Sequence, residues 1–219
     1  MLQDQVANRY PFSMPFGWFS VTETDDLAVG QTRAVYYFGT HLVVWRDETG
    51  EAHVQDAFCP HLGAHLGHGG AVRNCEIECP FHGWKFNAEG ENTDIPYSER
   101  TNKKAKLKTY PVTEVNGFVF AWYHPQDEPP KWEMEAVAEI ATDDFAGPKK
   151  SKHVVQAGIQ EMAENAVDSA HFRYVHNVAE VPEIVRYDMV DHQTFMESLQ
   201  RFPTPRGVVD GQINAQQLG

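Results

Sequence analysis

The sequence has little cysteine, little positive charge and no long apolar run. Only 3 of its 219 residues are Cys, too few for a disulfide scaffold. Lys and Arg number 18 against 31 Asp and Glu, so the net charge is −13. This argues against nucleic-acid binding, because phosphate contacts need clustered Lys and Arg. No apolar run is long enough to span a membrane, and the first residues do not resemble a signal peptide. We therefore expect a cytoplasmic protein.

The sequence also lacks the Gly-x-Gly-x-x-Gly pattern of dinucleotide-binding folds. We therefore expect NADH or flavin to bind a partner protein rather than this chain. Hydrophobic residues make up 42% of the chain and charged residues 22%, as is typical of a globular protein. One basic run stands out, Lys-Lys-Ala-Lys-Leu-Lys at 103–108. It indicates either a solvated loop leading into a strand or a docking patch for an acidic redox partner.

Branched and aromatic residues between turn signals predict an antiparallel β domain at residues 18–124. The strongest turn signal is Asn116-Gly117, because both positions of that hairpin turn need a positive φ; Gly39-Thr40 is a second predicted turn. The predicted strands cover residues 32–38, 41–45, 52–58, 76–78, 84–87, 107–110, 112–115 and 118–122.

Proline and charge at residues 124–130 and 143–148 interrupt every periodicity, so we place a linker at 125–150. Residues 1–17, with two prolines and several aromatics, are expected to form an N-terminal arm. Within 151–219 the sequence predicts a strand at 152–156 and one helix at 159–174, which Pro182 cannot continue. The tail predicts short strand-like pieces.

Two short segments each offer a thiolate and an imidazole. Cys59 and His61 form the first pair, and Cys79 and His82 the second. Such residues ligate zinc or the irons of an iron–sulfur cluster. A structural zinc site is the main alternative, although the single-residue gap between Cys59 and His61 is unusual for it.

The motifs Cys-Pro-His-Leu-Gly at 59–63 and Cys-Pro-Phe-His-Gly-Trp at 79–84 resemble the Rieske iron–sulfur motif. The resemblance implies a [2Fe–2S] cluster with Cys59 and Cys79 on one iron and His61 and His82 on the other. Respiratory Rieske proteins carry a disulfide at the positions matching Ala64 and Phe81. Its absence makes the chain similar to the oxygenase and ferredoxin branch.

A second group, Asp168, His171 and His176, would by itself indicate no more than a polar helix face. Two histidines and a carboxylate are, however, the ligand set of mononuclear iron(II) oxygenases. The run at 164–176 resembles the iron-binding helix of Rieske oxygenase α subunits. That resemblance implies His171 and His176 as iron ligands and Asp168 as a bridge between the two metal centres. Residues expected to support the ligands are Glu161, Glu164 and Asn165.

The chain is most similar to the branch of 3-ketosteroid 9α-hydroxylases and cholesterol 7-desaturases. The implied fold class is α+β: an N-terminal all-β Rieske domain, then an incomplete, helix-grip-like catalytic domain at 151–219. In the family the carboxylate ligand lies far downstream of the two histidines. We find none in this chain, since Asp188, Asp191 and Asp210 lack a matching context, and we therefore expect a truncated domain.

The implied function is that of the terminal oxygenase component of a Rieske monooxygenase. A separate ferredoxin or flavin reductase supplies electrons, and O2 is activated at a mononuclear iron beside a hydrophobic, steroid-like substrate. Monooxygenation, dioxygenation and desaturation are left open. The resemblance also implies a homotrimer. From the charge and the lack of a long apolar run, we expect neither nucleic acid nor a membrane as a partner. The alternative is a Rieske ferredoxin-like electron carrier without oxygenase activity.

Overall fold

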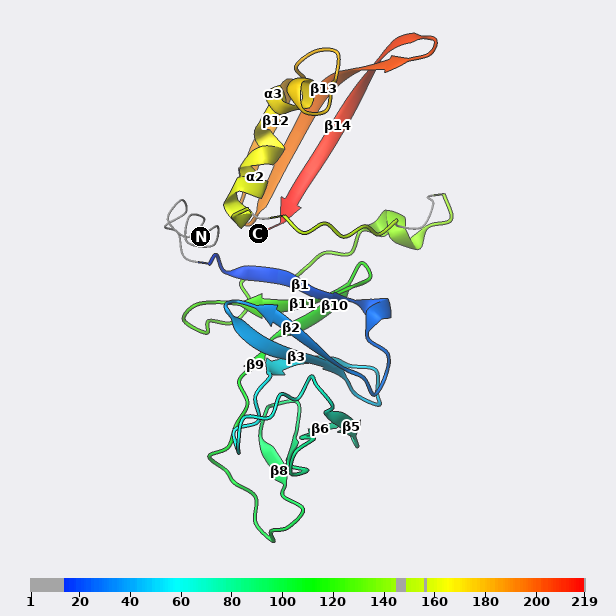
Figure 1. Cartoon of the computed structure of the whole chain (residues 1–219). Helices are drawn as coiled ribbons and strands as arrows, with labels where there is room; N and C mark the ends of the chain where they lie inside the picture. Colours follow the sequence, from blue (N-terminus) through cyan, green and yellow to red (C-terminus); the bar gives the residue numbers. More distant parts are fainter. Residues whose placement is uncertain (1–13, 145–148, 156, 219) are drawn as a thin grey trace. The chain divides into compact units, whose positions relative to one another are not determined.

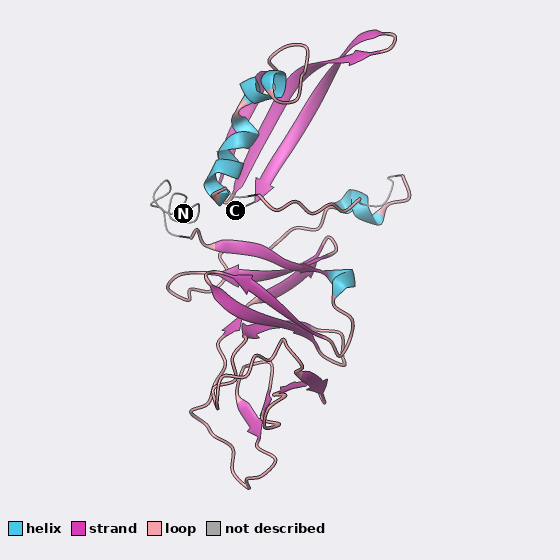
Figure 2. Cartoon of the chain, in the orientation of Figure 1, coloured by secondary structure: helices cyan, strands magenta, loops and turns pink. Residues whose placement is uncertain are grey.

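The structure, a computed structural model, describes residues 14–144, 149–155 and 157–218. The chain divides into two compact units, one spanning Met14–Pro148 and the other containing Lys149–Gly219. Strands dominate both units, and helices occur mainly in the second (Figure 2). The predicted arm at 1–17 lies almost wholly outside the described residues. The predicted succession of an all-β domain and an α+β domain is confirmed.

The described residues of the first unit form three antiparallel sheets, and most of their strands are labelled in Figure 1. A short 3-10 helix, η1 (Thr24–Asp26), follows the first strand. One sheet has the order β1 (Gly17–Glu23), β11 (Phe118–Tyr123), β10 (Val112–Val115). The second has the order β2 (Thr32–Tyr37), β3 (Thr40–Arg46), β4 (Ala52–Asp56), β9 (Thr109–Tyr110). The third has the order β5 (Ala71–Arg73), β6 (Glu76–Glu78), β7 (Lys85–Phe86), β8 (Asn92–Asp94).

Strand β3 separates two hydrophobic cores. Leu42 and Val44 belong to one core, and Val43 and Trp45 to the other, and all four are fully buried. Successive side chains of a strand point to opposite faces, so a continuous apolar run here indicates a strand covered on both sides. The Val43 and Trp45 core also contains both cysteines of the predicted metal motif.

One predicted hairpin turn is confirmed and one is displaced. Asn116 and its following Gly have φ values of 55° and 82°, as the predicted turn requires. Between β2 and β3 the turn residues are Phe38 and Gly39, with φ values of 57° and 75°, rather than Gly39-Thr40. Tyr37 instead pairs with Thr40. The Phe38 ring stacks on Tyr123, with ring centroids 4.6 Å apart, and this packing compensates for a backbone conformation that phenylalanine disfavours.

The segment after β11 packs on the β domain. The Trp132 ring lies edge-on to Trp122, with centroids 4.7 Å apart, and Trp18 Nε1 donates to the Trp132 carbonyl at 2.8 Å. The Asn116 side chain donates a hydrogen bond to the Glu135 carbonyl and accepts one from the Val137 N–H. Much of the segment predicted as a linker at 125–150 therefore lies in the first unit, where a 3-10 helix, η2 (Ala138–Ala141), follows.

The described residues of the second unit form two short helices and one antiparallel sheet (Figure 1). The helices are α2 (Ile159–Val167) and α3 (Ser169–Tyr174). The sheet has the order β12 (Glu183–Val190), β13 (Gln193–Thr204), β14 (Gly207–Leu218). No helix within the described ranges is long and apolar enough to cross a membrane.

Three local predictions for this unit are wrong. The strand predicted at 152–156 is absent over 152–155, which are exposed and unpaired, and residue 156 lies outside the described residues. The single helix predicted at 159–174 breaks at Asp168, where ψ is 91°. The tail forms long strands rather than short pieces, because Met196, Ser198 and Gln200 alternate on one buried face. Residues on one face of a strand recur at every second position, and these three do so although only Met196 is apolar.

Asp47 organises the turn between β3 and β4, and its replacement should weaken the fold. Its carboxylate accepts from the backbone N–H groups of Thr49 and Glu51 and from His53. Burial raises the pKa of this carboxyl, but these hydrogen bonds outweigh burial and lower the pKa from 3.8 to about 2. Because the folded-state pKa is the lower one, the stabilisation is complete above 3.8 and disappears as the pH falls toward about 2.

We expect Asp47→Asn to reduce the free energy of unfolding at neutral pH by about 2 kcal/mol. Its stability should also change less than that of the parent protein as the pH falls through this range. Urea titrations at several pH values measure both effects, with the exposed Asp143→Asn as control. Equal acid sensitivity of Asp47→Asn and the parent protein would show that another group dominates.

Candidate metal sites

The two motif loops share one backbone design. In each, the Cys N–H donates to the carbonyl five residues later, and the Cys carbonyl accepts from the Gly N–H four residues later. Both distances are 2.9 Å for Cys59, and they are 2.8 and 3.0 Å for Cys79. The glycines, Gly63 and Gly83, have φ values of 76° and 68°, a region that favours glycine. The loops therefore present equivalent cysteines in equivalent turns.

The four side chains of the motif converge between these loops. Cys59 and Cys79 are each 2% exposed, and both lie in the same hydrophobic core. Burial, with a further contribution from Cys79, raises the pKa of the Cys59 thiol to about 11. The rings of His61 and His82 lie closer to the surface, with centroids 4.7 Å apart. Two sulfurs thus lie inside, and two imidazoles lie outside.

The spacing of these ligands favours a group larger than one zinc ion. Ligands of a single zinc lie within about 4 Å of one another, because the metal–ligand bonds are about 2.0–2.3 Å long. Among the described residues, the only group of three potential ligands whose atoms lie mutually within 4.8 Å is Asp47, Glu51 and His53, so the motif is more widely spaced. His82 Nδ1 is buried and has no hydrogen-bond partner in the described chain, as expected for an atom that ligates a metal.

Aromatic side chains surround the two histidines. The His61 ring stacks on Trp84 at 4.5 Å with an interplanar angle of 5°, and Trp84 Nε1 donates to the Tyr97 hydroxyl at 2.6 Å. Phe81 packs on His82, with centroids 4.0 Å apart. Phe81 and Tyr97 are more than 60% exposed, as is Leu62 in the first loop. The imidazole edge of the site therefore lies within an exposed apolar collar, defined as Leu62, Phe81 and Tyr97.

The predicted absence of a disulfide at this site agrees with the structure. Ala64 and Phe81 occupy the positions in question, and the three cysteines are free. The third cysteine, Cys75, is half-buried. His65 lies outside the converging set. Its Nδ1 accepts from the Gly67 N–H at 3.1 Å, so this ring helps to shape the loop.

Asp168 and His171 meet where α2 gives way to α3. Asp168 caps α3, and its carboxylate accepts from the Ala170 N–H at 3.0 Å. His171 Nδ1 donates to the Asp168 carbonyl at 2.5 Å, while the Asp168 carboxylate lies 3.9 Å away. This bond occupies Nδ1 and leaves Nε2 of a neutral imidazole as the available ligand atom.

His176 reaches the same place because α3 is short. The helix ends at Tyr174, and the N–H of Val178 donates back to the Phe172 carbonyl at 3.1 Å. The rings of His171 and His176 are consequently 5.2 Å apart. An unbroken helix would not bring two histidines five positions apart onto one face, so the end of α3 is what allows this pairing.

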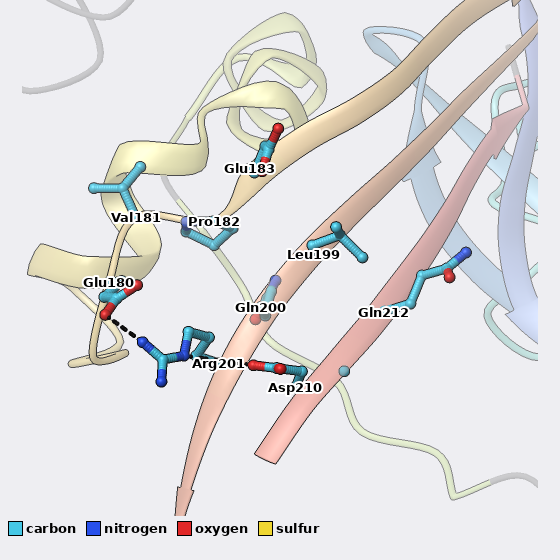
Figure 3. Close-up of a pocket in the computed structure, with 10 residues that line it drawn as sticks. Glu180, Val181, Pro182, Glu183, Leu199, Gln200, Arg201, Asp210 and Gln212 are labelled. Carbon is cyan, nitrogen blue, oxygen red and sulfur yellow. Dashed lines mark hydrogen bonds and ion pairs between the residues drawn. The ribbon is translucent and has the colours of Figure 1, made fainter. Parts of the chain in front are cut away.

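Most of the other candidate residues have contacts of their own elsewhere in the second unit. Glu161 accepts from the Gly158 N–H at 3.0 Å and so closes the start of α2. Glu164 accepts from Gln160, and Asn165 is exposed. Among the candidate carboxylates, Asp210 lies 3.4 Å from Arg201 in the pocket of Figure 3, where Arg201 also contacts Glu180.

The remaining two candidate carboxylates also have local roles. Asp188 forms an ion pair with Arg186. Asp191 occupies the turn between β12 and β13, with a φ of 52°. Neither arrangement brings the carboxylate to the histidine pair, so the described residues supply two of the three expected iron ligands.

Comparisons with known proteins also divide the chain into two parts. Residues 17–111 match the Rieske [2Fe–2S] domain, and residues 121–217 match the 3-ketosteroid 9alpha-hydroxylase C-terminal domain. Cholesterol 7-desaturase from Xenopus laevis is 42% identical over 173 residues, which cover 78% of this chain and 38% of that protein. A probable 3-ketosteroid-9-alpha-monooxygenase oxygenase component from Rhodococcus rhodochrous is 39% identical over 164 residues, covering 73% and 41%.

The chain spans 35–44% of the length of the first curated relatives that it matches. Among solved structures, dicamba monooxygenase bound to dicamba has a TM-score of 0.70 at 18% identity, covering 92% of this chain and 63% of that one. At this identity the similarity shows the fold alone.

The two adjoining domains define the chain as a member of the Rieske oxygenase family. Within the family it is similar to the branch that contains 3-ketosteroid 9α-hydroxylases and cholesterol 7-desaturases. The cofactors of such a protein are a [2Fe–2S] cluster and a mononuclear iron. The buried thiol pair, the adjacent imidazole pair and the unpartnered His82 Nδ1 fit the cluster. The pair of His171 and His176 fits a non-haem iron.

Gly83 provides a test of the loop geometry. A Cβ at this position would lie 2.9 Å from Pro96 Cγ, and φ is +68°. Gly63 has a φ of +76°, but a Cβ there would meet nothing within 4 Å. Both Ala variants should lose about 1–2 kcal/mol to the left-handed backbone, and Gly83→Ala should lose more and bind less iron and sulfide. Urea unfolding and sulfide analysis of both variants measure this, and equal losses would contradict a role for the Pro96 contact.

Proposed function

We propose that this chain is part of the oxygenase component of a Rieske oxygenase system that oxidises a hydrophobic, sterol-like substrate. The single observation that carries the proposal is the pair of His171 and His176. Their rings are 5.2 Å apart at the end of a short helix, and the Nδ1 atom of His171 is occupied by a backbone carbonyl. An electron carrier without an oxygenase site would need no such pair.

In this proposal the first unit holds the cluster and the second holds the iron. Cys59 and Cys79 bind one iron of the cluster, and His61 and His82 bind the other. The fully buried core behind the cysteines excludes water from the sulfur side, so that electrons enter and leave at the exposed imidazole edge. We take residues 18–124 as the Rieske domain, 125–150 as the connection and 151–219 as the part of the catalytic domain present here.

The iron of the second unit, when bound by His171 and His176, supplies the chemistry of dioxygen activation. The chain's own residues orient the ligands. The Asp168 carbonyl fixes the ring of His171 through Nδ1, and the return of the chain at Val178 holds His176 beside it. Glu161, Glu164 and Asn165 on α2 support this arrangement in our proposal, Glu161 by closing the start of the helix.

We further propose that Asp168 bridges the iron site to the cluster of a second copy of the chain in a homotrimer. Its side chain is 54% exposed, which leaves the carboxylate accessible to an imidazole edge. The exposed collar of Leu62, Phe81 and Tyr97 around that edge suits a protein neighbour. A carboxylate between two imidazoles would orient both rings and couple the two centres.

The substrate class and the electron donor are inferred from the relatives. The matched proteins are named cholesterol 7-desaturase and 3-ketosteroid-9-alpha-monooxygenase, oxygenase component. Because the second relative is named as an oxygenase component, we infer that a separate protein, such as a ferredoxin or a flavin reductase, donates the electrons. The names support a sterol-like substrate, and they leave desaturation and hydroxylation as the two candidate outcomes.

A single-turnover experiment tests this function. The protein is reduced with dithionite, freed of excess reductant, and mixed with cholesterol and air. We expect the cluster to be reoxidised faster with cholesterol than without it, with a sterol product that has lost two hydrogen atoms or gained one oxygen atom. Mass spectrometry identifies the product. Reoxidation at an unchanged rate with unaltered cholesterol would support the electron-carrier alternative for this chain.

A further inference from the structure

The loop between β8 and β9, whose path Figure 1 shows, contains several lysines that the proposed function does not use. Lysines alternate with buried apolar residues, since Ala105 is 6% and Leu107 2% exposed. This alternation directs Lys104, Lys106 and Lys108 to one side of the segment, and Lys103 is exposed beside them in the turn at 103–104. We call the exposed cations of this loop the lysine ridge; its members are Arg100, Lys103, Lys104, Lys106 and Lys108.

The buried side of the ridge belongs to the core of the proposed cluster site. Ala105 and Leu107 lie in the same hydrophobic core as Cys59 and Cys79. The same loop contributes Tyr97, whose hydroxyl accepts from the indole that stacks on a motif imidazole. The ridge is therefore attached directly to the part of the β domain that would hold the cluster.

The loop is also held in one conformation by its backbone. The Asn102 N–H donates to the Asn92 side chain at 2.8 Å, and Asn92 is 3% exposed. The Leu107 N–H donates to the Gly90 carbonyl at 2.8 Å. Preorganised cations lose less conformational entropy when a partner binds. The loop therefore presents its lysines from an ordered backbone rather than from a flexible basic tail.

Part of the positive charge of the ridge is not neutralised locally. Lys106 lies 3.7 Å from Glu91, and Lys108 forms an ion pair with Asp127. Arg100, Lys103 and Lys104 form no ion pair within the described part of the chain. The whole chain, by contrast, has a net charge of −13. An acidic protein would thus be repelled by most of the surface and attracted at the ridge, which selects one orientation.

We propose that the lysine ridge is the docking face for an acidic electron-carrier protein. This inference rests on the proposed function, since it concerns delivery of electrons to the same cluster site. In the docked complex one electron passes from the reduced centre of the carrier to this chain. The carrier is oxidised and the chain is reduced, and no covalent bond forms or breaks. Charge steering of this kind accelerates association about 10–1,000-fold and weakens as the ionic strength rises.

The test uses a reduced plant-type [2Fe–2S] ferredoxin as the acidic probe. The ridge variant is Lys103→Glu with Lys104→Glu. The matched control is Lys149→Glu with Lys152→Glu, which makes the same charge change at two exposed lysines of the second unit. Calorimetry measures the binding of oxidised ferredoxin at low and high salt. Stopped-flow absorbance measures reduction by ferredoxin and, separately, by dithionite.

We expect the ridge variant to bind ferredoxin at least 10-fold more weakly at low salt and the control to change less than 2-fold. High salt should remove most of this difference. Reduction by ferredoxin should slow in parallel, while reduction by dithionite is unchanged. Equal weakening in both variants, or no salt-dependent binding of ferredoxin, would overturn the inference. Binding of anionic phosphatidylserine vesicles at the ridge without ferredoxin binding would overturn it as well, in favour of a lipid surface.

Failure of the docking proposal can be distinguished from failure of the proposed function. Protein that contains no sulfide and is not reduced by dithionite would refute the cluster and with it the function. Protein that is reduced normally by dithionite and oxidises cholesterol, but whose ridge variant behaves as the control does, would refute the docking face alone.

Discussion

Replacement of His171 or His176 by Ala is expected to remove the mononuclear iron while the [2Fe–2S] cluster stays in place. The two rings are 5.2 Å apart in the second unit, whereas the proposed cluster ligands all belong to the first. Loss of a direct ligand should weaken iron binding by more than the about 10–100-fold that loss of a supporting partner costs. Product formation should fall below detection, and the visible spectrum and sulfide content should be unchanged.

A matched control makes this result specific. His153→Ala removes another histidine of the second unit, one that is exposed and has no part in the proposed site. It should leave the iron content at the parent value. If His171→Ala and His176→Ala kept all their iron, the assignment of both ligands would be wrong. If they also lost sulfide, the change would have unfolded the protein rather than removed a ligand.

Asp168→Ala is expected to slow electron transfer between the centres about 10–100-fold, the usual cost of removing a supporting carboxylate. Both metals should stay bound, because the His171 ring is held by the Asp168 backbone carbonyl rather than by its carboxylate. Rapid-mixing absorbance of the prereduced protein with cholesterol and oxygen measures this rate as the loss of the reduced-cluster spectrum.

The capping role of Asp168 needs a separate control. Its carboxylate accepts from the Ala170 N–H, and an Ala variant loses this cap at a cost of about 1 kcal/mol. Asp168→Ser keeps a capping oxygen but removes the carboxylate. If Asp168 is the bridge, both variants are slow. If Asp168→Ser transfers electrons at the parent rate, the residue acts on α3 alone, and the proposed bridge is wrong.

The sequence predicts the first unit well because its signals are local. The Asn116-Gly117 turn requires left-handed backbone at both positions, and few residue pairs provide it. In the paired Cys and His motifs the ligands are only two or three residues apart, so one tight turn fixes their relative positions. The displaced turn at Phe38 shows the limit, since stacking on Tyr123, far away in the sequence, determines it.

The second unit is harder to predict because long-range packing determines it. Asp168 interrupts the helix through its own capping bond, although the flanking residues are all compatible with one helix. Ser198 and Gln200 lie on the buried face of β13, where a sequence pattern would place apolar residues. The packing of Trp132 on Trp122 joins the predicted linker to the β domain, and no local pattern signals that contact.

The most direct test of the central claim is the iron and acid-labile sulfide content of the purified protein, measured together with zinc. In the proposed assignment Cys59, His61, Cys79 and His82 bind two irons with two sulfides, and His171 with His176 binds one further iron. The account therefore predicts three irons and two sulfides per chain and a coloured protein. A colourless protein with zinc and no sulfide would contradict it.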